Sequence, residues 1–202
     1  AIARSDSETI AEVGDYVTLP VNDLNVTASN ASRQITDADG YFVGAFSAGL
    51  NVSTAESKTS TRVVFGKDPV GPGARTGDII LLASSVDENQ GFSTASGGGV
   101  VSGSATISNA DASDTDDEKS SSVDIANWSS GYTNAPIGAG LVQIEANHQT
   151  YFYAGADSIN VSALGGSGAK ADVDVDLDTE VSLGNNVSFY ADQIEFSATR
   201  EL

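Results

Sequence analysis

Residues 179–199 read TEVSLGNNVSFYADQIEFSAT, and a matching phrase, TIAEVGDYVTLPVNDLNVTA, occupies residues 9–28. The two phrases align without a gap, so that Gly14 corresponds to Gly184. Both alternate apolar and polar residues with a period of two, which indicates β-strands separated by turns. Self-similarity at a fixed spacing is typical of a repeat architecture, so these phrases decide the expected fold.

Two looser copies lie between the outer phrases. TRVVFG at 61–66 is followed by DIILLAS at 78–84, and SVDIAN at 122–127 is followed by LVQIEA at 141–146. The outer copies are 170 positions apart (184 − 14), which leaves three intervals of roughly 57 residues each. We therefore expect residues 1–202 to form one continuous segment of a longer chain. The expected units are 9–60, 61–121 and 122–178, with the start of a fourth at 179–202.

The fold predicted from these units is all-β, because no long stretch carries the helical spacing of apolar residues. We expect a right-handed parallel β-helix, or β-solenoid, in which short strands stack about 4.8 Å apart. The handedness follows the usual rule for parallel crossovers. Strands of about three to six residues and about two to three coils per unit are expected. Tandem β-sandwich modules are the alternative, although a sandwich needs about 100 residues.

The formal charge of −19 and the sequence pI near 4.1 limit the classes of partner. A field of this sign opposes binding to nucleic acid, and no apolar stretch is long enough for insertion into a membrane. There is no Cys, so neither disulfides nor thiolate chemistry contribute. The acidic surface favours hydration and cations.

The repeated phrases resemble the shafts of large bacterial surface adhesins of the filamentous-haemagglutinin-like and leukotoxin-like class. Three stretches carry the resemblance: residues 9–29, 95–110 and 179–199. It implies a parallel β-helix, an extracellular or cell-surface location, and a role in attachment or matrix formation, and it transfers no catalytic residue. We therefore expect a non-catalytic structural segment of an adhesin or extracellular filament. Its expected partners are further copies of itself, stacked end to end into a fibre, and a cell-surface glycan or matrix.

Enzyme chemistry has little support in the sequence. The one His, His148, lies in EANHQTYF without a nucleophile motif such as G-x-S-x-G, and a strand His is more often structural. A carbohydrate-active β-helix, either a polysaccharide lyase or a tail-spike-like glycosidase, is the alternative function. It needs paired carboxylates in a cleft, and the alternating stripe of Asp172, Asp174 and Asp176 is a candidate.

Carboxylate clusters are candidates for Ca²⁺, the one cofactor considered, because hard cations prefer oxygen ligands. Asp37 and Asp39 stand in the sequence D-A-D-G, which resembles the start of a calcium loop but lacks a downstream bidentate Glu. An acidic loop expected to protrude at 110–122 supplies the others, namely Asp111, Asp114, Asp116, Asp117 and Glu118.

Aromatic side chains are the candidates for contact with carbohydrate, because sugar faces stack on aromatic rings. Tyr151 and Tyr153 belong to a consecutive aromatic cluster, and Trp128 and Tyr132 lie near it in the sequence. The structural alternative is that Phe152 is buried and the two tyrosines only flank it.

Overall fold

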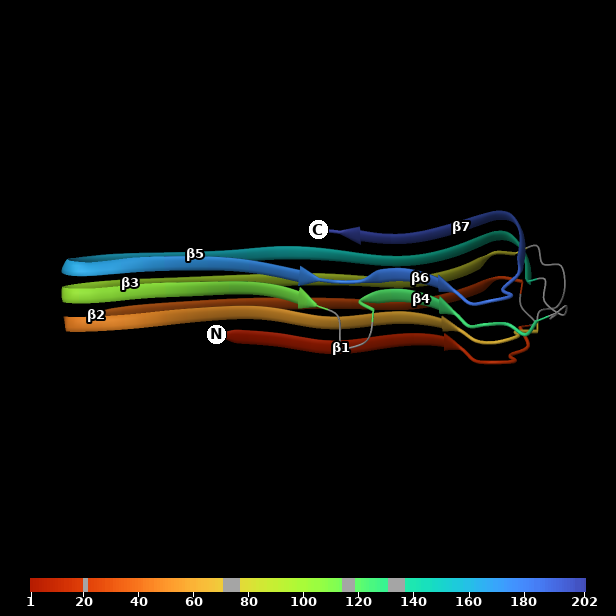
Figure 1. The fold of residues 1–202 in the computed structure, drawn as a ribbon, viewed down its shortest axis with the longest axis horizontal. Coiled ribbons are helices and arrows are strands. Elements are labelled where there is room, and N and C mark those ends of the chain that lie inside the picture. Colours follow the sequence, from red (N-terminus) through yellow and green to blue (C-terminus); the bar gives the residue numbers. More distant parts are fainter. Residues whose placement is uncertain (20–21, 71–76, 114–118, 131–136) are drawn as a thin grey trace.

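The computed structural model describes residues 1–19, 22–70, 77–113, 119–130 and 137–202. All of its regular structure is β-strand (Figure 1). The seven strands are β1 (Ile2–Val13), β2 (Leu24–Phe65), β3 (Ile79–Ser113), β4 (Ser121–Ile125), β5 (Ile137–Asp176), β6 (Thr179–Leu183) and β7 (Phe189–Glu201).

The strands form one sheet in the order β6-β4-β2-β3-β5-β7, with β1 also paired to β2. Every pairing of these strands is parallel. The separation between paired residues is 52 residues for β1 and β2, as in Ile2–Thr54, 55 for β2 and β3, and 63 for β3 and β5. A separation near 57 residues thus corresponds to one rung of the ladder, and the expectation of two to three coils per unit is wrong.

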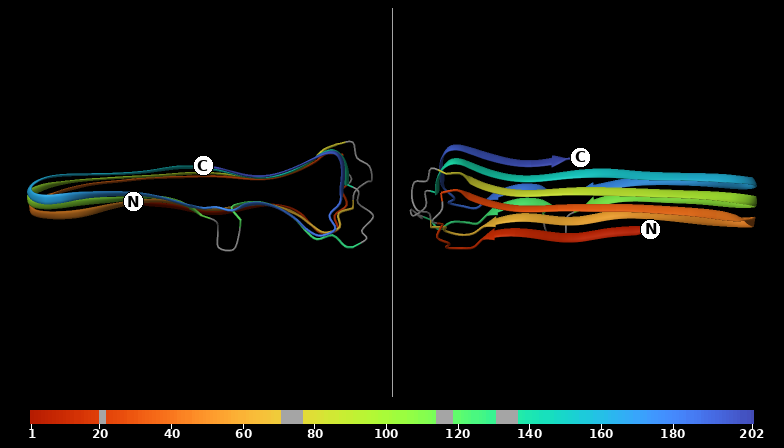
Figure 2. Two further views of the ribbon diagram at one scale, coloured as in Figure 1. Left: turned by 45° about the horizontal axis from the view of Figure 1, so that its top comes forward. Right: turned by 180° about the vertical axis from the view of Figure 1, so that it is seen from behind.

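Each long strand runs outward, reverses and returns, so that two layers face each other (Figure 2). The layers lie close together at the reversal, which we call the tip, and diverge at the opposite, wide end. Gly44 and Gly99 are paired at the tip, and a Cβ on Gly99 would overlap the carbonyl oxygen of Gly44. Glycine is required at Gly99 because the two backbones approach so closely there.

The strands are far longer than the three to six residues expected, since β2 alone has 42 residues. Gly and Asp inside it do not end the strand, because residues 24–44 and 46–58 pair in parallel with β3 and residues 54–65 pair with β1. The segments 41–57, 91–113 and 150–173 lie within β2, β3 and β5. Tandem β-sandwich modules are wrong, since sandwich sheets are antiparallel and every described pairing is parallel.

The apolar core lies at the wide end, where apolar residues stack on apolar residues of the next rung. Phe65 pairs with Ile125, and Ile79 pairs with Val142. The buried cluster consists of Leu19, Ala28, Val63, Phe65, Ile79, Leu81, Ala83, Val123, Ile125, Trp128, Val142, Ile144 and Ala146. Burial of this apolar surface is the main hydrophobic stabilisation of the structure.

The interior between the wide end and the tip is polar. Its side chains are mostly short hydroxyl and amide groups that bond across the two layers or between rungs, as in Thr36–Ser53 at 2.6 Å and Ser104–Ser158 at 2.8 Å. Small side chains suit this region because the layers are close. Their hydrogen bonds offset the cost of removing polar groups from water.

Candidate functional site

We call the part of the two layers between the wide end and the tip the limbs. A buried polar network lies inside the limbs and contains the one His. The His148 Nε2 atom lies 2.9 Å from Oδ2 of Asp87, and both side chains are 0% exposed. Ser32 donates to Oδ1 of Asp87 at 2.5 Å, and Thr59 donates to Oδ2 at 2.9 Å. These four residues come from β2, β3 and β5, so the network ties neighbouring rungs together.

The environment of Asp87 favours its ionised form. Burial alone would raise the pKa of Asp87, but hydrogen bonds from His148 and Ser32, the charge of His148 and the Thr59 hydroxyl together hold that pKa below its ordinary value of 3.8. The Asp87 and His148 side chains have no exposed surface, so no substrate atom reaches either member of the pair in this structure. The arrangement is that of a buried hydrogen-bond network that stabilises the packing of β2, β3 and β5.

The calcium candidates Asp37 and Asp39 lie inside β2 in extended backbone, not in a loop of the kind that D-A-D-G resembles. Gly40 is needed for another reason, because a Cβ there would overlap the side chain of Asn51. That amide donates to the Thr94 carbonyl at 2.5 Å and so joins β2 to β3. Asp39 itself accepts a hydrogen bond from the Thr94 hydroxyl.

Of the other calcium candidates, Asp111 lies inside β3 rather than in the loop expected at 110–122, because β3 continues to Ser113. Asp111 is described and pairs with Glu56 on one side and Asp174 on the other. Burial, followed by the charges of Asp174, Glu56 and Asp172, raises the pKa of Asp111. Asp114, Asp116, Asp117 and Glu118 lie outside the described residues. Among the residues that are described, no group of three or more His, Asp or Glu side chains is arranged to hold a metal ion.

The two tyrosines proposed for carbohydrate contact lie on the outer face of β5. Tyr151 and Tyr153 are both more than half exposed, and the Tyr153 ring packs against Phe92 of β3, with 4.9 Å between ring centroids. A Cβ on Gly155 would lie 2.8 Å from the Tyr153 ring, so this glycine leaves room for the ring. Sequence reasoning missed Phe92, because the register that brings it beside β5 is not visible in the sequence.

The remaining two aromatic candidates do not join this group. Trp128 is only 3% exposed and packs edge-on against Phe189, with 5.7 Å between centroids, so its ring is part of the apolar core. The prediction that Trp128 is an exposed sugar contact is therefore wrong. Tyr132 lies outside the described residues.

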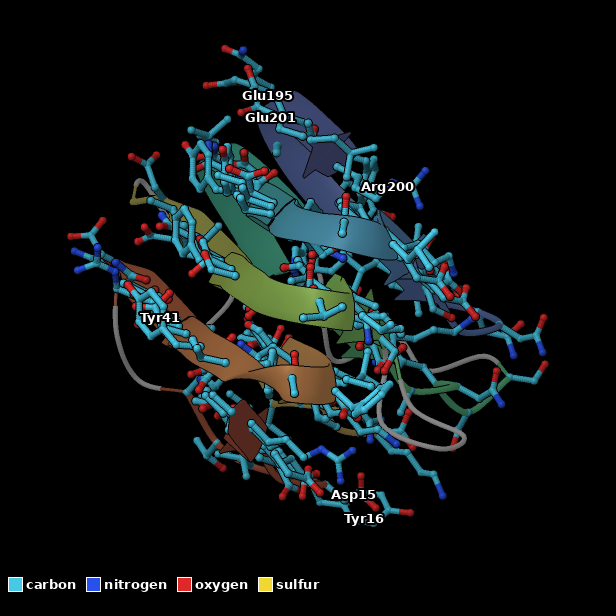
Figure 3. All side chains as sticks on the ribbon, turned by 90° about the vertical axis from the view of Figure 1, so that its left-hand side faces the viewer. Asp15, Tyr16, Tyr41, Glu195, Arg200 and Glu201 are labelled. Atoms are coloured by element: carbon cyan, nitrogen blue, oxygen red, sulfur yellow. The ribbon has the colours of Figure 1, made fainter. Side chains whose placement is uncertain are left out.

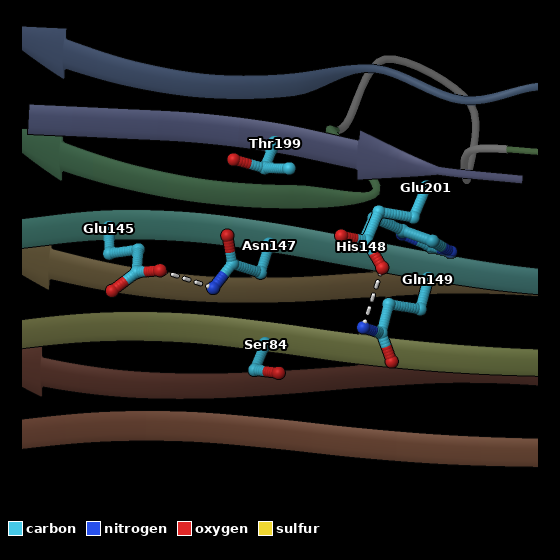
Figure 4. Close-up of a pocket in the computed structure, with 7 residues that line it drawn as sticks. All are labelled: Ser84, Glu145, Asn147, His148, Gln149, Thr199 and Glu201. Carbon is cyan, nitrogen blue, oxygen red and sulfur yellow. Dashed lines mark hydrogen bonds between the residues drawn. The ribbon is translucent and has the colours of Figure 1, made fainter.

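A shallow polar groove of about 300 Å³ lies on the same outer face (Figure 4). It is lined by Ser84, Glu145, Asn147, Gln149, Thr199 and Glu201, together with His148, whose side chain is itself 0% exposed. Both carboxylates already accept hydrogen bonds, Glu145 from Asn147 at 2.7 Å and Glu201 from Gln149 at 2.9 Å. Because alternate residues of a strand share a face, Gln149 of the groove and the aromatic pair of Tyr151 and Tyr153 lie on the same face of β5.

Comparison with protein-family models, curated proteins and solved structures gives no match for this chain. Its function is therefore argued from its own residues. The described part of the chain has no helix long and apolar enough to cross a membrane.

Proposed function

We propose that this chain is a structural, non-catalytic segment of a secreted surface adhesin or extracellular filament, built as a right-handed parallel β-helix. The observation that carries the proposal is the single parallel ladder, whose rungs follow one another at separations of 52 to 63 residues. The phrases that align in the sequence occupy one column of it. Thr9, Thr61, Ser121 and Thr179 pair in succession.

A ladder of this kind suits a load-bearing shaft. Each rung contacts its neighbours, so stability accumulates along the stack. No disulfide is available, and backbone hydrogen bonds and stacked apolar residues replace it. The charge of −19 keeps such a surface hydrated. Ca²⁺ held by the acidic segment after β3 would relieve part of the repulsion.

Stacking of copies end to end is part of the proposal. β1 and β7 lie at opposite ends of the stack (Figure 1), and among the described strands each pairs on one side only. An unpaired parallel edge accepts another strand of the same kind. Growth by this route adds rungs about 4.8 Å apart along the filament axis.

Fibre diffraction and electron microscopy of the concentrated protein test the filament proposal. We expect filaments with a reflection near 4.8 Å along the axis, because the strands lie across it. Particles that never elongate, or a reflection of this spacing across the axis, would contradict end-to-end stacking.

Attachment is proposed to use the outer face of β5, where Tyr151 and Tyr153 are exposed and the half-buried Phe92 of β3 packs against the Tyr153 ring. The electron-rich face of a ring attracts the C–H bonds of a sugar, and nearby amides such as Gln90 and Gln149 can bond hydroxyl groups. The surrounding acidic charge selects against anionic polysaccharides. Titration with cellohexaose, mannohexaose and polygalacturonate tests this. A Tyr153→Ala variant should bind the neutral oligomers less tightly, whereas Tyr190→Ala, an exposed tyrosine elsewhere, should not.

A carbohydrate-active β-helix is the second candidate, favoured by the two carboxylates, Glu145 and Glu201, in the polar groove. Glycoside hydrolysis uses such a pair, one as acid and the other as base or nucleophile. Release of reducing ends from neutral polysaccharides tests it. Activity that disappears in both Glu145→Gln and Glu201→Gln would replace the structural proposal, and no activity in the unaltered chain would remove the alternative.

A further inference from the structure

β1 and β7 are half rungs that lie in opposite layers. β7 runs toward the tip and pairs with residues 137–149 of β5, whereas β1 runs toward the wide end and pairs with residues 54–65 of β2 (Figure 1). In the described part of the chain, no strand lies on the outer edge of β6 or on the outer edge of residues 24–31 of β2. Each end of the stack therefore lacks the half rung that the other end carries. Figure 3 views both ends along the strands, with labels on Glu195, Arg200 and Glu201 at one end and on Asp15 and Tyr16 at the other.

The apolar core is uncovered at both ends of the stack. Paired residues form columns through the core, and two of these columns run from Leu24 and Val26 at one end to Ile194 and Phe196 at the other. Ile194 and Phe196 are 44% and 48% exposed, although the residues of β5 that they pair with are 0% exposed. Stacked repeats normally end in polar caps that shield the core from water. A second copy placed in line would continue both columns, with Leu24 on Ile194 and Val26 on Phe196.

The two ends also match in length and in backbone shape. Residues 9–28 and 179–198 align without a gap. Both form a strand, a turn and a second strand, since one turn joins β1 to β2 and the other joins β6 to β7. The equivalent turn residues Tyr16 and Asn186 have φ values of 57° and 61°. One phrase can therefore lie on the other, residue for residue, without an insertion.

Gly14 gives an independent indication of a partner at this turn. A Cβ on Gly66 would lie 2.5 Å from the backbone of Gly14, and a Cβ on Gly184 would lie 2.4 Å from the backbone of Ala126. Each of these two glycines makes room for the turn of the preceding rung. Among the described atoms, a Cβ on Gly14 would meet only Val17, at an ordinary 3.7 Å, and the φ of Gly14 is not positive. Glycine is needed there when the turn at Gly184 of another copy lies against it.

We propose that copies of this chain stack by sharing one rung, in which β7 of one copy and β1 of the next occupy opposite layers. Ile194 of one copy then lies beside Leu24 of the next, and Thr179 lies beside Thr9. The inference rests on the end-to-end stacking proposed above and specifies its contact, polarity and register. Unlike ends meet, so the contact repeats into an open filament. Because β1, β2, β3 and β5 lie in successive rungs, copies are four rungs, or about 19 Å, apart.

Like charges on the outer face oppose this contact. The column that contains Asp6 ends in Asp176, so the shared rung sets these two carboxylates side by side. The fold already accepts such an arrangement, because Glu56, Asp111 and Asp174 pair in succession within one chain. Salt screens repulsion between exposed charges. We therefore expect assembly to increase as NaCl rises to about 0.5 M.

A disulfide trap tests the shared rung. Thr27 and Ser197 end one column, which passes through Leu82 and Glu145. Within one chain they are three rungs, about 14 Å, apart, which no disulfide spans, whereas in the shared rung they are neighbours at about 4.8 Å. Mild oxidation of Thr27→Cys/Ser197→Cys in about 0.5 M NaCl should give a ladder of covalent oligomers on a non-reducing gel. Thr27→Cys/Gln193→Cys, four residues out of register on the same face, should not.

A glycine substitution tests the same contact without a cross-link. Gly14→Ala should leave the circular dichroism spectrum unchanged and should not lower the urea midpoint of a single chain. It should raise the protein concentration needed for filaments by at least about tenfold, because the added methyl group meets the backbone at Gly184 of the next copy. Gly168→Ala is the matched control, since a Cβ there would meet nothing within 4 Å. It should change that concentration by less than about twofold.

The outcomes separate this inference from the stacking on which it rests. Filaments whose Thr27→Cys/Ser197→Cys variant gives no ladder, or which Gly14→Ala leaves unchanged, would overturn the shared rung and leave stacking through another contact. A ladder as strong in the out-of-register control would also overturn it. Neither filaments nor a ladder at any salt concentration would overturn end-to-end stacking itself.

Discussion

The wide end and the polar limbs of this molecule use the same backbone ladder with opposite interiors. At the wide end Phe65 stacks on Ile125 in a dry apolar cluster, whereas in the limbs Asp87 bonds to His148 between layers of Ser and Thr. Apolar burial is favourable at any register that keeps the alternation of faces. A hydrogen-bonded network is favourable only when particular atoms meet. The comparison indicates that the wide end supplies most of the stability of the folded chain. The hydrogen bonds in the limbs select the register in which each strand pairs with the next rung.

The largest expected effect is at the wide end. Phe65→Ala removes a large, fully buried side chain and leaves a cavity among stacked neighbours, so the free energy of unfolding should fall by about 4 kcal/mol. Urea denaturation followed by circular dichroism measures this change. A loss below about 1 kcal/mol would mean that the wide end is not the dominant core.

The next effect is expected in the limbs. Asp87→Ala leaves His148, Ser32 and Thr59 without their shared acceptor, which should cost about 3 kcal/mol at pH 7. Ser93→Ala is the matched control, because the buried Ser93 hydroxyl has no hydrogen-bond partner in the structure and its removal should cost little. Equal losses in the two variants would show that the network does not select or hold the limbs.

Asp87 also makes the stability of the folded chain depend on pH. Because the folded-state pKa of Asp87 lies below 3.8, its ionised form adds stability above that pH, and this contribution is lost as the pH falls through the lowered value. Urea midpoints measured from pH 7 down to acid should therefore decline more steeply below 3.8 in the unaltered chain than in Asp87→Ala. Parallel curves would contradict the assignment.

A smaller effect is expected at the tip. Gly99→Ala places a methyl group on the Gly44 carbonyl and should cost about 1 to 3 kcal/mol, because backbone has to move. At the neighbouring Gly98 a Cβ would lie 3.7 Å from the Val161 carbonyl, which is ordinary contact. Gly98→Ala should therefore be neutral or stabilising, since it reduces the entropy of the unfolded chain. Thermal unfolding of the two variants gives the comparison directly.

Local pattern was enough to predict the β class and the parallel pairing. Alternation in the phrases at 9–28 and 179–199 indicated strands, and their spacing suggested which residues stack. Sequence pattern failed to predict the role of a residue wherever that role depends on the side chain that faces it from the other layer or the next rung. Gly40 suggested a calcium turn but makes room for Asn51, and Asp87 is 61 residues from His148, about one rung away.

The register of the ladder is the central claim, and a chain without Cys allows a direct measurement of it. Ser29 and Ser84 are paired neighbours on β2 and β3. Paired parallel strands lie about 4.8 Å apart, within the Cα separation that a disulfide spans. A Ser29→Cys/Ser84→Cys variant should oxidise to an intramolecular disulfide in the native state. A Ser29→Cys/Glu88→Cys control, four residues out of register, should not. Efficient bonding in the control, or none in the first variant, would contradict the 55-residue register on which the proposed β-helix depends.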